Sequence, residues 1–219
     1  MPRRKAPAAR PTRAEKSAAT RRALIRAATE VVGEHGYAGA SVARITARAK
    51  VAQGTFYNYF RSRQDLLDSL LPQLGRDLLD HVRAEVAGSA GVADMEARGL
   101  RAFFDFLVDV PGFYRVLNEA ETLAPRAHKR HFALLTDRYV AALARAQQAG
   151  ELQGYRPDEL EALVYILMAA RSYLALRYAV HGKRMRRVPD SVVATWAKFV
   201  ASGLGTTAPA PGRRKTYAT

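Results

Sequence analysis

The side chains with the most evident chemistry lie around residue 55, where polar groups alternate with two phenylalanines. Phe56 and Phe60 are four residues apart, so they share one face of a helix expected over residues 53–60. This spacing leaves the following polar side chains on the outer face: Gln53, Thr55, Tyr57, Asn58 and Arg61. Their amide, hydroxyl and guanidinium groups can hydrogen-bond to phosphates and base edges, and a single helix fits the major groove of DNA, which is about 12 Å wide.

Positive charge is concentrated in the same part of the chain. The 219 residues include 35 Lys and Arg against 20 Asp and Glu, a formal net charge of +15. Residues 1–63 hold 14 of these cations and three glutamates, a net of +11. This asymmetry favours a polyanion-binding module followed by a nearly neutral remainder.

Several kinds of catalytic chemistry are excluded. The chain has no cysteine, which rules out disulfides, Cys-ligated zinc, iron–sulfur clusters and thiol nucleophiles. It contains no phosphate-binding glycine loop, no Gly-x-Ser-x-Gly and no paired-carboxylate motif. His128 and His131 have a spacing that could share a metal, but no third ligand accompanies them, so we expect surface or pocket-edge imidazoles. We therefore predict no enzyme, no cofactor and no metal.

The hydropathy pattern predicts a cytoplasmic protein without a membrane partner. Within the helices expected in the C-terminal half, the longest uncharged stretch, residues 162–170, is far shorter than the about 20 residues of a membrane-spanning helix. The basic N-terminus is not followed by the apolar run of a signal peptide.

Glycine and proline divide the chain into pieces of helical length, and no segment alternates as a strand would, so we predict an all-α fold of about nine helices. Residues 1–16 are expected to be a disordered basic arm and residues 205–219 a disordered tail. Helices are expected over about 20–34, 41–49, 53–60, 63–86, 92–109, 113–123, 126–149, 158–180 and 190–202. Pro72 should kink the fourth helix or remove one of its hydrogen bonds.

Residues 36–67 carry an ordered motif: a Gly-aromatic pair, a hydroxyl residue opening a helix, a Gly-hydroxyl-aromatic-Tyr core and a terminal Leu-Leu. The matching positions are Gly36-Tyr37, Ser41, Ile45-Thr46, Gly54-Thr55-Phe56-Tyr57, Tyr59-Phe60, Ser62-Arg63 and Leu66-Leu67. This run resembles the helix-turn-helix signature of TetR/AcrR-type bacterial transcriptional regulators. The resemblance covers about a quarter of the chain.

The resemblance implies roles for individual residues. Phosphate contacts would come from Ser41, Tyr57 and Arg63, and base contacts from Gln53, Gly54, Thr55 and Asn58; Ala43 and Arg44 occupy positions that sometimes touch DNA. Ser41 could also serve only as a helix cap and Tyr57 only in packing. Two positions depart from the pattern: Lys50 replaces the usual turn glycine, and Ala52 replaces the usual capping Ser or Thr.

The same resemblance implies that residues 17–63 form the DNA-binding domain, with its helix-turn-helix at about 41–60, and that residues 64–204 bind an effector and dimerise. An aromatic stripe in this second region could be core or pocket. As pocket residues we predict Phe103, Phe106, Leu107, Phe113, Tyr114, Leu117, Leu135, Tyr139, Met168, Arg171 and Ser172. The effector would be a small molecule, apolar or lipid-like.

The helix over residues 158–180 is apolar around most of its circumference, so one chain cannot bury it alone. A homodimer would cover it, and a central helix in a monomer is the alternative. The predicted interface residues are Leu163, Leu167, Leu174, Trp196, Phe199 and Val200.

Arg171 lies within this apolar helix, where an unpaired guanidinium would be costly. We expect it to pair with Glu119 or Glu121; an exposed position and an acidic ligand group are the alternatives.

Together these features predict a bacterial homodimeric regulator, a repressor that leaves a palindromic double-stranded DNA operator when an effector binds. A non-sequence-specific architectural DNA-binding protein without effector is the first rival, and an α-helical enzyme with a basic arm is the second.

Overall fold

The computed structural model describes residues 12–182 and 184–205, and within them helices dominate. The elements in chain order are α1 (Arg13–Gly39), α2 (Val42–Ala49), α3 (Gln53–Phe56), α4 (Arg63–Val86), α5 (Val92–Asp109), α6 (Gly112–Leu123), α7 (Pro125–Gln148), the short 3-10 turn η1 (Pro157–Glu159), α8 (Leu160–Tyr178), β1 (Val180–His181), β2 (Arg184–Met185) and α9 (Asp190–Gly203). The all-α prediction is confirmed.

Two expectations about the first helix and about strands were wrong. α1 begins at Arg13 because Thr12 and Glu15 form a reciprocal capping box, so residues 13–16 are helical rather than part of a disordered arm. The remainder of the predicted arm and tail, residues 1–11 and 206–219, lies outside the described residues. The tiny antiparallel hairpin of β1 and β2 was not predicted, because two-residue strands are too short to show alternation.

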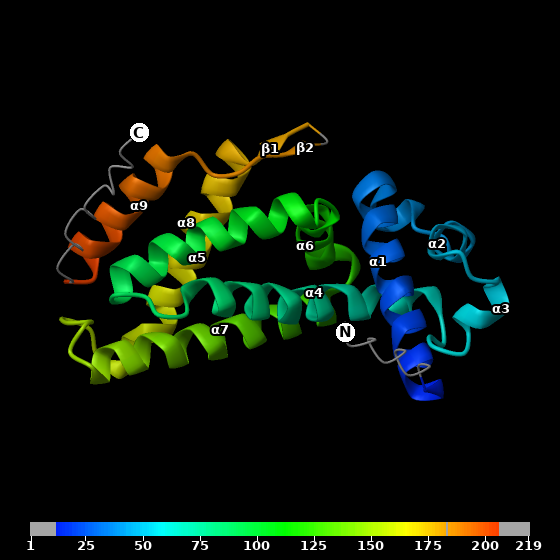
Figure 1. Cartoon of the computed structure of the whole chain (residues 1–219), viewed down its shortest axis with the longest axis horizontal. Coiled ribbons are helices and arrows are strands. Elements are labelled where there is room, and N and C mark those ends of the chain that lie inside the picture. The colour runs from blue at the N-terminus through cyan, green and yellow to red at the C-terminus, as the bar shows by residue number, and fades with distance from the viewer. Residues whose placement is uncertain (1–11, 183, 206–219) are drawn as a thin grey trace, which may run out of the picture.

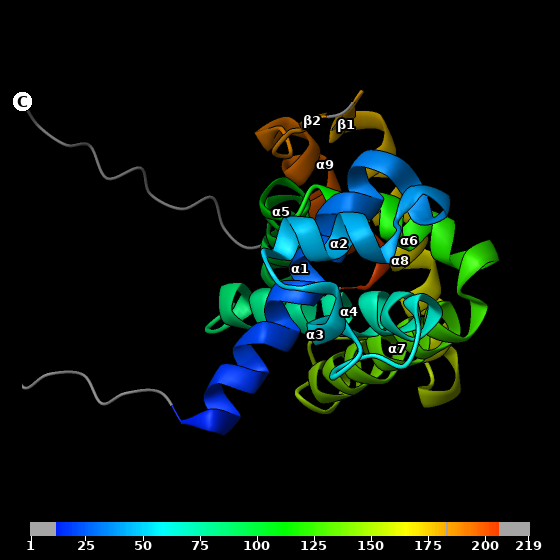
Figure 2. The same cartoon turned by 90° about the vertical axis from the view of Figure 1, so that its right-hand side faces the viewer.

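The helices form two groups joined by one long helix. Figure 1 shows α1–α3 at one end of the molecule and most of α5–α9 toward the other, with α6 beside α1 and α4 running from the first group into the second, between α5 and α7. We call α1–α3 the head, α5–α9 the body and α4 the connector helix. Seen from the end that carries the head, α2 and α3 lie in front (Figure 2).

A single hydrophobic cluster runs from the head through the connector helix into the body. In the head, Phe56 and Phe60 are almost fully buried, as their spacing predicted. The first half of the connector helix adds Leu66, Leu67, Leu70 and Leu71 to the same core. Phe56 and Phe60 therefore anchor α3 and the turn after it in the same core as the start of α4.

The head and body meet where α6 crosses α1. A Cβ atom on Gly33 would lie 2.7 Å from the Cα atom of Gly112, and one on Gly112 would collide with the backbone carbonyl of Thr29. Next to this contact, Glu119 of α6 accepts hydrogen bonds from the Tyr37 backbone N–H at 2.7 Å and from Arg115 at 2.6 Å. The bond to Tyr37 holds α6 to the end of α1, where Gly36 interrupts the helix with φ 71°.

Pro72 lies inside α4, which continues through it. Proline has no N–H to offer the carbonyl four residues earlier, which is that of Asp68. The guanidinium of Arg130 on α7 donates to that carbonyl at 2.9 Å. The predicted loss of a helical hydrogen bond is thus compensated by another helix.

None of the helices in the described part of the chain is long and apolar enough to cross a membrane.

The contact of α1 with α6 generates a stability prediction. Gly112→Ala should lower the free energy of unfolding by about 1–3 kcal/mol, because the new methyl group meets backbone that must move. Gly203→Ala is the matched control, since nothing lies within 4 Å of its Cβ position, and it should be neutral or slightly stabilising. Urea denaturation followed by circular dichroism measures both. Equal stability of the two variants would show that the helices can separate without cost.

Candidate DNA-binding and effector sites

The turn between α2 and α3 explains how the head presents its polar residues. Ser41 caps α2, and its side chain accepts a hydrogen bond from the Arg44 backbone N–H at 3.2 Å. Lys50 ends α2 in a left-handed conformation, with φ 57° and ψ 43°. Ala52 makes no side-chain cap for α3. Both departures seen in the sequence therefore fall at positions where they cost stability, about 1 kcal/mol each.

The regular part of α3 is shorter than predicted. It ends at Phe56, and the backbone continues as a turn through Tyr59 instead of as helix to Phe60. A four-residue helix with no side-chain cap has few hydrogen bonds of its own, so it depends on the Phe56 and Phe60 anchors. The edge-to-face contact of Phe56 with Tyr57, at 5.2 Å between ring centroids, adds to this support.

The outer surface of the head carries most of the residues assigned to DNA. Tyr57 is 60% exposed, although aromatic side chains are usually buried. Gln53, Gly54 and Asn58 are exposed, and Thr55 is half-buried. On α2, Ser41, Ala43 and Arg44 are exposed as well. These side chains come from α2, α3 and the turn after it, at the end of the molecule that faces the viewer in Figure 2.

Two arginines of the motif make contacts within the head. Arg63 donates to the backbone carbonyls of Tyr37 and Ala40, the latter at 2.7 Å, and so ties the start of α4 to the end of α1. Arg44 donates to the Gly39 carbonyl at 2.7 Å. For Arg63, this use of the guanidinium competes with the phosphate contact that the resemblance implied. The sequence pattern could not reveal it, because the acceptors are backbone atoms distant in sequence.

The predicted effector residues do not outline one cavity. Phe106, Leu107 and Phe113 are buried in the core, where Phe106 and Phe113 pack edge to face. Phe103, Tyr114, Leu117, Leu135, Tyr139 and Met168 are half-buried, and Ser172 is exposed with its hydroxyl donating to the Met168 carbonyl. The two depressions that stand out on the body lie elsewhere, between α7 and α8, and share none of these residues.

Arg171 forms an internal salt bridge, but with a different partner from those predicted. Its guanidinium donates to Glu96 of α5 at 2.6 Å, and the Glu96 side chain is 1% exposed. The predicted candidates lie elsewhere: Glu119 is engaged at the junction with the head, and Glu121 is exposed. The prediction placed the partner of Arg171 on α6, whereas the partner is on α5. Sequence spacing could not show this, because the pairing depends on where α5 lies relative to α8 in the fold.

The ion pair is the centre of a polar network in the body. The Tyr139 hydroxyl donates to Glu96 at 2.5 Å, and the indole N–H of Trp196 donates to the Glu96 backbone carbonyl at 3.2 Å. The Arg171 guanidinium also lies over the rings of Tyr139 and Trp196. Burial raises the pKa of Tyr139 well above its usual value, so its hydroxyl stays protonated and donates. The network joins α5, α7, α8 and α9.

The predicted dimer residues are mostly used inside the chain. Leu163, Leu167, Trp196 and Val200 are buried, Leu174 is half-buried, and only Phe199 is largely exposed. The opposite face of α8 is an apolar surface that the described part of the chain leaves uncovered. Its exposed fractions are 46% for Tyr165, 57% for Ile166, 75% for Tyr173 and 52% for Leu176.

The two histidines of α7 differ: His128 lines one of the depressions, as expected of a surface or pocket-edge imidazole, whereas the expectation was wrong for His131. His131 is buried, and burial lowers its pKa to about 4, so the ring is neutral near pH 7. His128 is half-buried beside Phe132. Within the described residues, no group of three His, Asp or Glu side chains could hold a metal ion.

Residues 24–70 match the family model described as bacterial regulatory proteins, tetR family. The chain is 31% identical over 84 residues to a fatty acid metabolism regulator protein of Bacillus subtilis, an alignment that spans 43% of that relative. It is 29% identical over 168 residues to the HTH-type transcriptional repressor NicS of Pseudomonas putida, covering 74% of this chain and 77% of the relative.

The fold of the whole chain also has counterparts among solved structures. FadR of Bacillus subtilis, solved in complex with stearoyl-CoA, superposes with a TM-score of 0.66 at 19% identity. The superposition covers 83% of this chain and 98% of that one. At this identity the likeness concerns the fold alone.

The buried network generates a stability prediction. Glu96→Leu should lower the free energy of unfolding by about 3–5 kcal/mol, because it leaves the Arg171 charge buried without a partner. The double variant Glu96→Leu with Arg171→Met should recover most of this loss, since no unpaired charge remains. Urea denaturation of the three proteins gives the comparison. A double variant as unstable as Glu96→Leu would mean that packing around Glu96, rather than charge pairing, dominates.

Proposed function

The chain belongs to the tetR family of bacterial transcriptional regulators, and on this premise we propose that it is a ligand-responsive repressor of a palindromic DNA operator. Residues 17–63 serve as the DNA-binding domain and residues 64–204 as the effector-binding and dimerisation domain. The effector lowers operator affinity by favouring an arrangement of the two heads that does not fit the DNA.

The exposed polar surface of α2 and α3 is the observation that carries the DNA-binding proposal. A 60% exposed tyrosine next to exposed amide side chains adds little to the stability of the chain but suits a groove. In this proposal Tyr57 and Ser41 donate to phosphates, while Gln53 and Asn58 hydrogen-bond base edges. Gly54 allows close approach of the backbone, since nothing lies within 4 Å of its Cβ position.

The uncovered face of α8 supports a homodimer. Tyr165, Ile166, Tyr173 and Leu176 form an apolar surface together with Phe199 of α9, and large exposed apolar patches usually mark interaction surfaces. A two-fold dimer also matches a palindromic operator, because each head then meets one half-site. Two weak half-sites bind more tightly when the dimer tethers the heads.

An apolar or lipid-like effector is supported by the relatives. One is a fatty acid metabolism regulator, and FadR of Bacillus subtilis was solved with stearoyl-CoA. In this chain the buried cation Arg171 is already neutralised by Glu96, which favours an effector held mainly by apolar contact in the body.

An architectural protein that binds DNA without sequence preference is the rival. It would need cationic contacts to phosphates but no exposed amides at base-reading positions. The contribution of Gln53 and Asn58 to sequence discrimination therefore distinguishes the two functions.

Gln53→Ala should reduce discrimination between the preferred duplex and a scrambled duplex by about 1–3 kcal/mol, because one base contact is lost. Tyr57→Phe is the matched variant: it removes only a hydroxyl and should weaken both duplexes alike. Fluorescence anisotropy with duplexes selected by the wild-type protein measures both. An equal loss on both duplexes for Gln53→Ala would remove this residue from the base-reading set.

Ile166→Lys combined with Tyr173→Glu should produce monomers with an intact fold, because both side chains are exposed in the single chain. The buried Trp196 is unsuitable for this test, since charge there would disturb the core. Arg138→Glu with Gln148→Lys, at exposed positions of α7, serves as control. Light scattering measures the mass. An unchanged dimer in the first variant would place the interface on another surface.

A further inference from the structure

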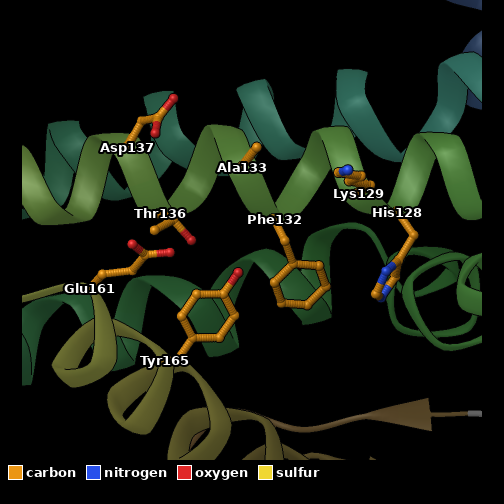
Figure 3. A pocket seen from close by; sticks show the side chains of 8 residues that line it. All are labelled: His128, Lys129, Phe132, Ala133, Thr136, Asp137, Glu161 and Tyr165. Carbon is orange, nitrogen blue, oxygen red and sulfur yellow. The ribbon is translucent and has the colours of Figure 1, made fainter.

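The larger depression on the body lies between α7 and α8 and has a volume of about 480 Å³. Figure 3 shows the rings of Phe132 and Tyr165 facing one another across it, with Thr136 and Glu161 on either side further along the groove. The Thr136 side chain is 7% exposed, and its hydroxyl has no hydrogen-bond partner. We call this depression the α7–α8 groove.

The same turn of α7 that lines the groove also holds the connector helix. His128, Lys129 and Phe132 line the groove, whereas Arg130 and His131 contact α4. An α-helix completes a turn every 3.6 residues, so residues 128–133 must face both neighbours. If this turn is displaced away from α8, it therefore displaces the part of α4 that Arg130 and His131 contact.

The contacts with α4 are concentrated at Pro72. Arg130 donates to the Asp68 carbonyl, which Pro72 cannot serve. The Nδ1 atom of His131 lies 3.2 Å from the Leu71 carbonyl. A carbonyl only accepts hydrogen bonds, so the neutral His131 ring carries its proton on Nδ1. Two consecutive residues of α7 thus contact two carbonyls of the connector helix, those of Asp68 and Leu71, which both precede Pro72.

The packing leaves the imidazole little freedom to move independently of α4. A Cβ atom on Gly75 of α4 would collide with Nδ1 of His131. The imidazole ring therefore lies against α4 at a residue that has no side chain. The ring also packs against Phe113 of α6, at 6.1 Å between centroids. Interiors packed this closely transmit displacements instead of absorbing them.

We propose that the α7 turn 128–133 couples the α7–α8 groove to the connector helix, with Arg130 and His131 as the positioning residues. An apolar group seated between Phe132 and Tyr165 pushes α7 toward α4, and α4 changes the orientation of the head. This proposal rests on the proposed function as a ligand-responsive regulator, and it names the element through which the response passes.

The absence of cysteine from the sequence allows a direct test. Glu161→Cys places one thiol at an exposed position that lines the groove. Benzyl methanethiosulfonate then attaches an apolar ring there, and methyl methanethiosulfonate attaches a minimal group. Affinity is measured by anisotropy for a duplex that the unmodified protein selects from a random library. The benzyl adduct should bind this duplex about tenfold more weakly than the methyl adduct, within the usual range of allosteric coupling.

The positioning residues are tested in the same background. Arg130→Ala combined with His131→Leu removes both donors to α4, and the benzyl effect should then disappear. Arg130→Lys with His131→Asn keeps a donor at each position and should restore at least part of it. A purely structural role would change thermal stability in both pairs without changing the difference between benzyl and methyl adducts. Gln148→Cys, exposed at the far end of α7, is the control and should show no benzyl effect.

Three results would overturn the proposal. The first is equal affinity of the benzyl and methyl adducts. The second is a benzyl effect that persists after both donors are removed from a protein that still folds. The third is dissociation of the dimer by the benzyl group, seen by light scattering, which would assign the groove to a second copy of the chain. Failure of the unmodified protein to select any sequence would instead contradict the proposed function.

Discussion

The close approach of α6 to α1 is the constraint on which the arrangement of head and body depends. Gly33 and Gly112 bring the two backbones so near that neither position has room for a methyl group. Glu119 then binds the Tyr37 backbone N–H, at the point where Gly36 breaks α1. Without this contact the head would be attached to the body by the connector helix alone, and its orientation would follow any bend of that helix.

The connector helix is held at a second place, by Arg130 and His131 of α7 near Pro72. The two places have different physical characters. At the α1–α6 contact backbone meets backbone, whereas at the α7 contact the side chains of Arg130 and His131 meet the backbone of α4 and hydrogen-bond to it. Hydrogen bonds of this kind contribute about 1 kcal/mol each, so they can be exchanged at modest cost. The contact of α7 with α4 is therefore the better place for a displacement caused by an effector. The contact of α6 with α1 is the better pivot for a rotation of the head.

Local features were predictable from the sequence, and pairings between distant segments were not. The connector helix and α5 have the predicted bounds because Ser62, Gly88 and Gly91 act on their immediate neighbours. The partner of Arg171 was mispredicted because a guanidinium indicates only that some carboxylate is near. The apolar pattern of α8 likewise showed two buried faces but not which one the chain itself covers. The base-reading assignments remain predictions that derive from the motif.

Sequence-specific DNA binding is the central claim, and selection of duplexes from a random library tests it most directly. We predict that the protein enriches one palindromic sequence and binds it at least about 1,000-fold more tightly than a scrambled duplex at physiological salt. The measurement must be made at a stated salt concentration, because phosphate contacts alone give strong binding at low salt. No enrichment, together with equal affinity for both duplexes, would contradict the claim and identify a non-specific DNA-binding protein.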